Sequence, residues 1–167
     1  MAAVANSTLL QWNAGTLDVS GACIVLVATE WNATIVQELE QGCRRVLAQY
    51  GVGKVETLLV PGAVEIPFAV QRHAALPGKP ADAYITLGCV IRGDTPHFEY
   101  VCRSVTDGVS QLNLRLPVPV IFGVLTVENE QQALERIGGR HGHKGEEAAI
   151  TALKMIALNN RISPSNA

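Results

Sequence analysis

A short polar segment in the middle of the chain combines a potential anion site with an imidazole. Thr95 and Pro96 are residue types typical of the N-cap and first position of a helix, and Gly93 would let a ligand approach the free N–H groups there. Such a helix start suits a phosphate, although the Asp94 carboxylate would repel one unless its side chain turns away. His97, in the first turn, would lie beside that anion and could transfer a proton near neutral pH. A single histidine in a helix is more often structural, so both roles stay open.

A second candidate for anion binding is the segment of residues 136–144, which reads RIGGRHGHK. It places three basic side chains and two histidines around three glycines. An arginine such as Arg136 can hold a phosphate through two parallel hydrogen bonds, which makes the segment a possible cationic clamp. The alternative is a solvated turn between two helices.

Three further side chains each have a structural and a functional interpretation. Trp31, in the polar turn TEWN, either caps the core or offers a stacking surface to a planar ring. Glu65 either stabilises a helix N-terminus or accepts hydrogen bonds from ligand hydroxyls. Phe122, inside an apolar run, is most simply a core residue.

Length and composition exclude several classes of protein. The chain has 167 residues, 48% of them hydrophobic and 17% charged, and a formal charge of -2. This composition excludes a disordered chain, and the low charge without a Lys/Arg block argues against a general nucleic-acid binder. The apolar runs are far shorter than the roughly 18 residues that a membrane-spanning helix needs.

Common motifs for several other chemistries are absent from the sequence. No GxGxxG, GxxxxGK[ST] or GxSxG pattern occurs, which argues against a dinucleotide fingerprint, a P-loop and a nucleophile elbow. The four cysteines lack CxxC spacing and the His-x-His of residues 141–143 lacks acidic partners, so we expect no metal site. Reduced cysteines and the absence of signal-peptide features lead us to expect a cytoplasmic protein.

The elements that must position these residues alternate along the chain. Apolar runs predict strands, and apolar residues at helical spacing predict helices. The expected strands are residues 22–28, 55–60, 83–91 and 118–125, and the expected helices are residues 34–50, 64–75, 97–115, 129–137 and 145–160.

Strands that are apolar throughout and alternate with amphipathic helices predict a parallel sheet covered on both faces. We therefore expect an α/β fold, a flavodoxin-like three-layer αβα sandwich with a four-stranded parallel sheet. We expect a flexible N-terminal arm over residues 1–21, a single domain over 22–160 and a C-terminal tail over 161–167. Ligands bind such sheets at the carboxyl ends of the strands, so we expect the chemistry at residues 29–32, 61–65, 91–97 and 125–129.

Four ordered segments resemble the lumazine synthase (6,7-dimethyl-8-ribityllumazine synthase) family of riboflavin biosynthesis. They read VPGAVEIP at residues 60–67, GCVIRGDTPHFEYV at 88–101, PVIFGVLT at 119–126 and KG at 144–145. The likeness runs in order from about residue 22 to 158, and it implies the fold that the periodicity predicts independently.

The resemblance implies a role for each site residue. The implied catalytic residues are His97, a general acid/base, and Arg136, which stabilises the phosphate as it leaves. The implied substrate contacts are Trp31 stacked on a pyrimidine, Ala63, Val64 and Glu65 along a ribityl chain, the backbone of Cys89, Val90 and Ile91 at the pyrimidine edge, Gly93, Asp94 and Thr95 around the phosphate, Lys144 near it, and Phe122 over the ring from a neighbouring subunit.

The same resemblance implies the reaction. Members join 5-amino-6-(D-ribitylamino)uracil to 3,4-dihydroxy-2-butanone 4-phosphate, through a Schiff base and elimination of phosphate, without a metal or redox cofactor. They form homopentamers with active sites between subunits, and some form larger shells. Two alternatives without catalysis stay open: a flavin-binding module that holds FMN, and a shell subunit. A larger stacking surface at Trp31, where many relatives carry Phe, leads us to expect stronger binding of fused-ring flavins.

Overall fold

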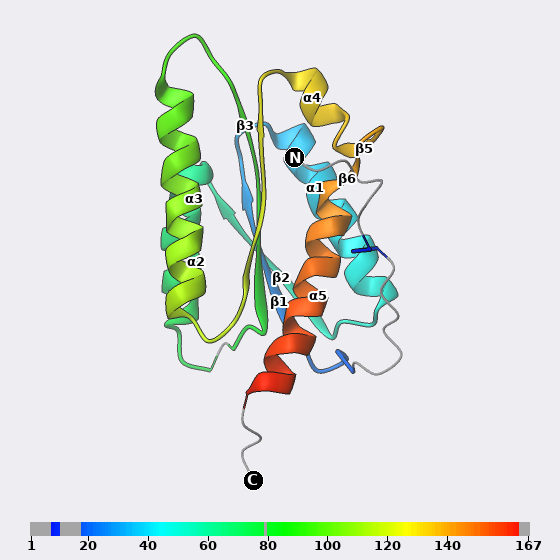
Figure 1. Cartoon of the computed structure of the whole chain (residues 1–167). Helices are drawn as coiled ribbons and strands as arrows, with labels where there is room; N and C mark the ends of the chain where they lie inside the picture. The colour runs from blue at the N-terminus through cyan, green and yellow to red at the C-terminus, as the bar shows by residue number, and fades with distance from the viewer. Residues whose placement is uncertain (1–7, 11–17, 79, 164–167) are drawn as a thin grey trace.

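The computed structural model of the chain describes residues 8–10, 18–78 and 80–163 (Figure 1). The expected N-terminal arm and C-terminal tail fall mainly outside these residues. In chain order the elements are β1 (Cys23–Thr29), α1 (Ala33–Gln49), β2 (Lys54–Val60), the 3-10 turn η2 (Ala63–Glu65), α2 (Ile66–Ala74), β3 (Ala83–Ile91), α3 (His97–Arg115), β4 (Val120–Val127), α4 (Glu130–Leu134), β5 (Ile137–Gly139), β6 (Gly142–His143) and α5 (Lys144–Ile162).

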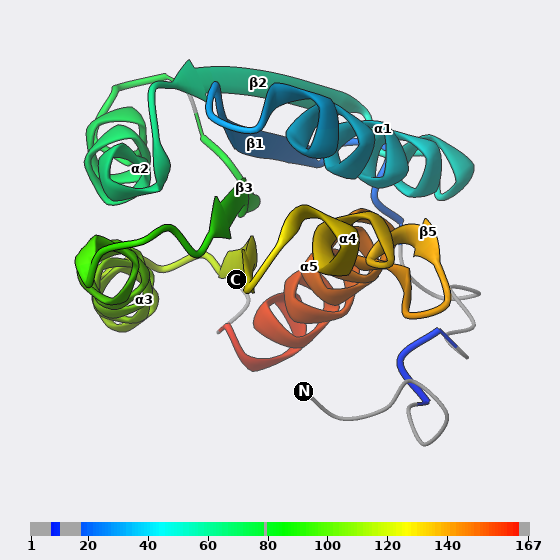
Figure 2. The same cartoon turned by 90° about the horizontal axis from the view of Figure 1, so that it is seen from above.

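The central sheet has four parallel strands in the order β2-β1-β3-β4. The two inner strands, β1 and β3, bury nearly all of their side chains, as strands covered on both faces must. Helices α1 and α5 pack on one face, and α2 and α3 pack on the other (Figure 2). The expected flavodoxin-like sandwich is therefore confirmed.

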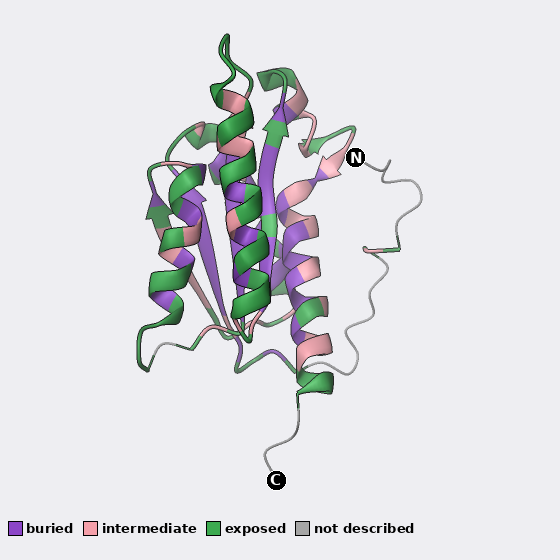
Figure 3. Cartoon of the chain, turned by 60° about the vertical axis from the view of Figure 1, so that its left-hand side comes forward, coloured by how far each residue is buried: buried purple, intermediate pink, exposed green. Residues whose placement is uncertain are grey.

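The helices bury one stripe each and expose the rest (Figure 3). In α1 the stripe includes Ile35, Leu39, Cys43 and Leu47, which recur at the spacing of one helix face. The chain leaves this helix through Gly51, whose φ of 73° is a left-handed conformation that glycine adopts without strain. Sequence periodicity thus places the core faces correctly.

Most of the predicted boundaries agree with the structure to within one or two residues. β3 and α3 have the predicted bounds. The predicted helix of residues 64–75 starts as η2 and continues as α2, with Pro67 in its first turn, where a missing N–H is tolerated. β4 begins and ends two residues later than predicted: it starts after Pro119, which has no N–H to donate, and its last residues pair with β3 up to Val127.

The region after β4 is where the sequence prediction was wrong. The predicted helix of residues 129–137 ends at Leu134, and the predicted turn between helices is a β-hairpin of β5 and β6. Gly138 and Gly142 have φ values of 116° and 74°, which take the chain out of the helical region. In the parts of the chain that the structure describes, we find no helix with the length and hydropathy to span a membrane.

Candidate active site

The turn after β1 holds Trp31 in an exposed position. Its side chain is 73% exposed, so it does not cap the core. The Glu30 and Trp31 amides donate to the carbonyls of Val60 and Pro61, which fastens this turn to the end of β2. A β-carbon built on Gly62 would lie 3.5 Å from Trp31 Cδ1, so the indole lies over that glycine. The arrangement leaves an aromatic surface free to stack on a planar ring.

Glu65 lies beside the same glycine, because its Oε2 would be 3.1 Å from a β-carbon at Gly62. Its side chain is exposed and makes no capping hydrogen bond to α2. Ala63 is buried under the turn and Val64 is exposed. The carboxylate is thus available to accept hydrogen bonds from ligand hydroxyls next to Trp31.

The end of β3 supplies backbone to this group. The side-chain amide of Asn32 donates to the Cys89 carbonyl at 2.8 Å, which brings the turn after β1 to β3. Val90 and Ile91 are half-buried and pair with Thr126 and Val127 of β4. Burial raises the pKa of the Cys89 thiol to about 11, which makes it a poor nucleophile at neutral pH.

The turn between β3 and α3 carries the residues of the predicted anion site, and its helix cap differs from the prediction. Pro96, not Thr95, is the N-cap, and α3 begins at His97. The Thr95 hydroxyl still accepts from the His97 amide at 3.4 Å, so it caps the helix from one position further out. Gly93, Asp94, Thr95 and His97 are all exposed, which leaves this helix start open to an anion.

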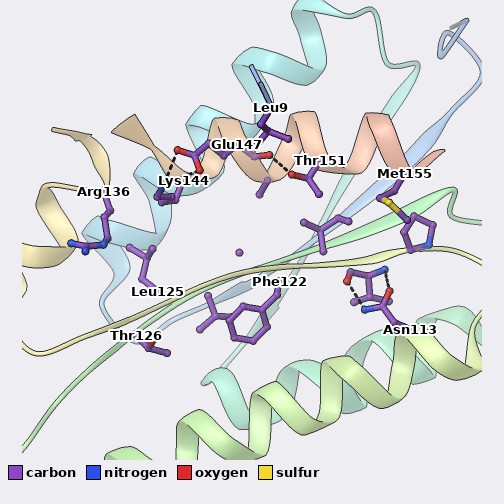
Figure 4. A pocket seen from close by; sticks show the side chains of 16 residues that line it. Leu9, Asn113, Phe122, Leu125, Thr126, Arg136, Lys144, Glu147, Thr151 and Met155 are labelled. Carbon is purple, nitrogen blue, oxygen red and sulfur yellow. Dashed lines mark hydrogen bonds and ion pairs between the residues drawn. The ribbon is translucent and has the colours of Figure 1, made fainter. Parts of the chain in front are cut away.

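A cavity of about 830 Å³ runs along β4 on the side facing α5 (Figure 4). Its lining includes Phe122, Arg136 and Lys144. Arg136 donates from Nη1 to the Gln132 carbonyl at 2.7 Å, while its buried Nε has no hydrogen-bond partner among the described residues. Lys144 Nζ lies 2.8 Å from both carboxylate oxygens of Glu147. The unused guanidinium donor and the cavity beside it suit an anionic ligand.

Phe122 is 41% exposed, which contradicts its interpretation as a core residue. It lies on β4, the last strand of the sheet, across that strand from Arg136 and Lys144 (Figure 4). An exposed aromatic ring at the open edge of a sheet is available to a ligand or to a second chain.

The structure thus gathers the predicted site residues into two groups. The first lies at the strand ends around Trp31, Glu65 and His97, and the second lies around Arg136 on the cavity along β4. Among the described residues, the lining of that cavity includes no member of the first group. Nor do the described residues contain a group of three or more His, Cys, Asp or Glu side chains with the geometry to hold a metal ion.

Comparison with known proteins decides the family. The model of the 6,7-dimethyl-8-ribityllumazine synthase family matches residues 21–160. The chain belongs to the lumazine synthase family. It is 48% identical over 142 residues to 6,7-dimethyl-8-ribityllumazine synthase of Parabacteroides distasonis, covering 83% of this chain and 87% of the relative. The enzyme of that name from Cytophaga hutchinsonii is 43% identical over 155 residues (92% and 96% covered), and that of Bdellovibrio bacteriovorus 50% over 137 residues (82% and 75%).

Two residues that hold the turns at the strand ends, Asn32 and Arg92, were not predicted from the sequence. Asn32 has φ 55° and ψ 44°, a left-handed conformation in which asparagine is enriched, and that preference was the available signal. Arg92 donates to Glu128 at 2.6 Å, pairs with Glu99 at 2.8 Å and lies 4.2 Å from the centre of the Phe98 ring. Arg92 thereby ties the turn after β3 to the end of β4, and its partner Glu128, 36 residues away, gave no local signal.

In the second group, the pair of Lys144 and Glu147 could have been found from the sequence. The two residues stand three apart on α5, a spacing at which opposite charges meet on one helix face. The Glu147 carboxylate pairs with the Lys144 ammonium group, and both residues line the cavity along β4.

Proposed function

We propose that this chain catalyses the condensation of 5-amino-6-(D-ribitylamino)uracil with 3,4-dihydroxy-2-butanone 4-phosphate to 6,7-dimethyl-8-ribityllumazine, with release of phosphate and water. The observation that carries the proposal is the family match over residues 21–160, which spans every candidate site residue. As a transferase of riboflavin biosynthesis, the protein joins two bound substrates, and holding both in a fixed geometry supplies much of the acceleration.

The strand-end group provides the pyrimidine side of the reaction. Trp31 stacks on the ring from its exposed position, and Glu65 accepts hydrogen bonds from the ribityl hydroxyls along Ala63 and Val64. The backbone of residues 89–91 meets the edge of the ring. This orientation places the ring amine for attack on the ketone of the second substrate.

The turn after β3 and the cavity cations provide the phosphate side. The helix start at Gly93, Asp94 and Thr95 offers backbone N–H groups to the phosphate. His97 moves the protons of imine formation and phosphate loss, a role that typically contributes about 10²–10⁴-fold to the rate. Arg136 stabilises the phosphate as its C–O bond breaks and charge grows on it. Ring closure with loss of water then completes the lumazine.

The arrangement of the two groups suits a site shared between chains. The second group lines the cavity along β4, no described residue of the first group does so, and Phe122 on this edge strand is exposed. We therefore propose a homopentamer in which Phe122, Arg136 and Lys144 of one subunit complete the strand-end group of its neighbour. Four free cysteines accord with the reducing cytoplasm that we propose for it.

The direct test is an absorbance assay of lumazine formation from the two substrates, with the uncatalysed reaction as background. His97→Ala should slow turnover by about 10²-fold or more. Arg115→Ala, at the opposite end of α3, is the matched control and should not. Formation no faster than background by the folded oligomer would overturn the proposal and favour a flavin-binding or shell-forming protein of this fold.

Complementation tests the shared site. His97→Ala and Arg136→Ala proteins, dissociated and reassembled together, should regain about a quarter of the sites, since random neighbours supply both intact groups at that frequency. Each variant reassembled alone is the control. If the mixture stays as inactive as its components, both groups act within one chain.

A further inference from the structure

His143 is a buried imidazole beside the site that the proposed chemistry leaves unused. It is 8% exposed and is the last residue of β6, directly before Lys144, the first residue of α5. Its Nδ1 accepts from the Glu146 amide at 3.4 Å and so caps the start of α5. Because Nδ1 is the acceptor there, Nε2 carries the hydrogen and donates it to Glu38 Oε1 of α1 at 3.3 Å.

The ring is held at a close crossing of α1 and α5. A β-carbon at Gly42 would overlap the His143 ring, and one at Gly145 would overlap the Leu39 carbonyl. The Cys43 thiol also donates to the Gly145 carbonyl at 3.0 Å. Glycines at both positions let the two helices touch, so His143 has little freedom to move relative to α1.

Glu38 is itself fixed by charge. Arg45 lies 3.2 Å from Glu38 Oε1 and 3.3 Å from Glu146 Oε1, so one guanidinium bridges both helices. The hydrogen bond from His143 is the main cause that lowers the pKa of Glu38, with Arg45 adding to it. The acceptor for His143 is therefore an ionised carboxylate at neutral pH, which strengthens the bond.

The hairpin that carries Arg136 needs such an attachment. Its two strands contain Gly138, Gly139 and Gly142, which lose much conformational freedom on ordering, and a two-stranded hairpin alone is marginal in water. The Lys144 amide donates to the Arg136 carbonyl at 2.8 Å, so the two site cations share one backbone frame. His143 supplies a side-chain hydrogen bond from that frame to α1.

We propose that His143 is a positioning residue: through Glu38 it fastens the hairpin to α1 and so sets where Arg136 and Lys144 meet the phosphate of the substrate. This inference rests on the proposed function. It predicts a selective effect, because the pyrimidine contacts lie at the strand ends and do not involve the hairpin.

The test measures KM for each substrate in His143→Ala, together with its melting temperature. KM for the phosphate substrate should rise about tenfold, and so should the inhibition constant of inorganic phosphate, since a displacement of about 1 Å is costly. KM for the pyrimidine should stay within about twofold. His143→Asn, which keeps a cap acceptor and a donor toward Glu38, should recover part of the loss.

His73→Ala is the matched control for lost stability. His73 is also a buried histidine, but it lies on the other face of the sheet and pairs with Tyr84 at 2.9 Å. The His73→Ala substitution should lower the melting temperature without a selective rise in KM for the phosphate substrate. If His143→Ala does not fold, Glu38→Ala removes the same attachment from a more exposed position and should give the same selective rise.

Two results would overturn the inference: no change in either KM in the folded variant, or equal changes in both that match those of His73→Ala. The activity of the unaltered chain distinguishes failure of the His143 inference from failure of the proposed function. If that chain forms no lumazine above background, the proposed function fails. If that chain forms lumazine, the results with the variants test only the role of His143.

Discussion

The side-chain amide of Asn32 donates a hydrogen bond to the Cys89 carbonyl at 2.8 Å, which joins the turn after β1 to the end of β3. The two residues stand 57 positions apart in the chain, yet this bond sets the distance between the exposed indole of Trp31 and the strand-end backbone. The position of the turn that carries Trp31 thus depends on this amide group together with the backbone bonds from Glu30 and Trp31 to the end of β2.

Replacing Asn32 should separate its two roles. Asn32→Ala loses the bond and puts alanine in a left-handed conformation that asparagine adopts more readily, so we expect a loss of about 2 kcal/mol in the free energy of unfolding. Asn32→Gly loses only the bond and should lose about 1 kcal/mol. Both should raise KM for the pyrimidine substrate. Urea denaturation and steady-state kinetics measure these effects, and an Asn32→Ala protein as stable as the parent would contradict them.

Arg136→Ala should weaken use of the phosphate substrate. Hydrogen bonds to charged groups contribute about 1.5–3 kcal/mol, so kcat/KM for that substrate should fall about tenfold to a hundredfold. Arg136→Lys keeps the charge but cannot form the two parallel bonds, and should recover only part of the loss. The dependence of rate on phosphate-substrate concentration is the measurement. An unchanged dependence in Arg136→Ala would refute the assignment.

Trp31→Phe should weaken the binding of riboflavin. The indole offers a larger surface than a phenyl ring, and stacking of aromatic rings contributes about 0.5–1.5 kcal/mol. We expect a Kd several-fold higher for Trp31→Phe and higher still for Trp31→Ala, measured by equilibrium dialysis with riboflavin absorbance as the signal. Equal affinity in the parent and Trp31→Phe proteins would rule out this role.

The thiols should react in an order set by burial. Burial raises the pKa of Cys43 to about 12 and that of Cys89 to about 11, so at pH 8 only about 10⁻³ of Cys89 is thiolate. Cys23 and Cys102 are half-buried and should be labelled first by a disulfide reagent. Mass spectrometry of the labelled protein reports the sites, and urea should equalise the rates. Native labelling of Cys89 as fast as Cys102 would contradict this.

The helices and strands that were predicted correctly are those that the local pattern of apolar residues determines. The apolar run of β3 and the apolar stripe of α3 predicted both elements with the bounds observed. The hairpin of β5 and β6 escaped because β5 and β6 are only three and two residues long, and their glycines read equally well as a loop.

The candidate site was predictable by residue type but not by position. The helix start near Thr95 and the arginine at 136 showed what they could bind, since those chemistries depend on side chain and spacing. Residue type alone could not decide whether Trp31 and Phe122 are exposed, because large aromatic residues are usually buried in most of their surface. The contact of Arg92 with Glu128 could not be predicted either, because it depends on β3 and β4 being neighbours in the sheet.

The open edge of β4 also bears on how the chain behaves when alone. A strand with unpaired backbone groups, an exposed Phe122 and a hollow beside it is a template for uncontrolled pairing with other chains. A variant made to block assembly at this edge should therefore precipitate and not persist as a stable monomer. To stay soluble, an assembly-blocked variant would need a charge on β4 itself, as in Phe122→Lys, because charged side chains prevent an edge strand from pairing with other chains.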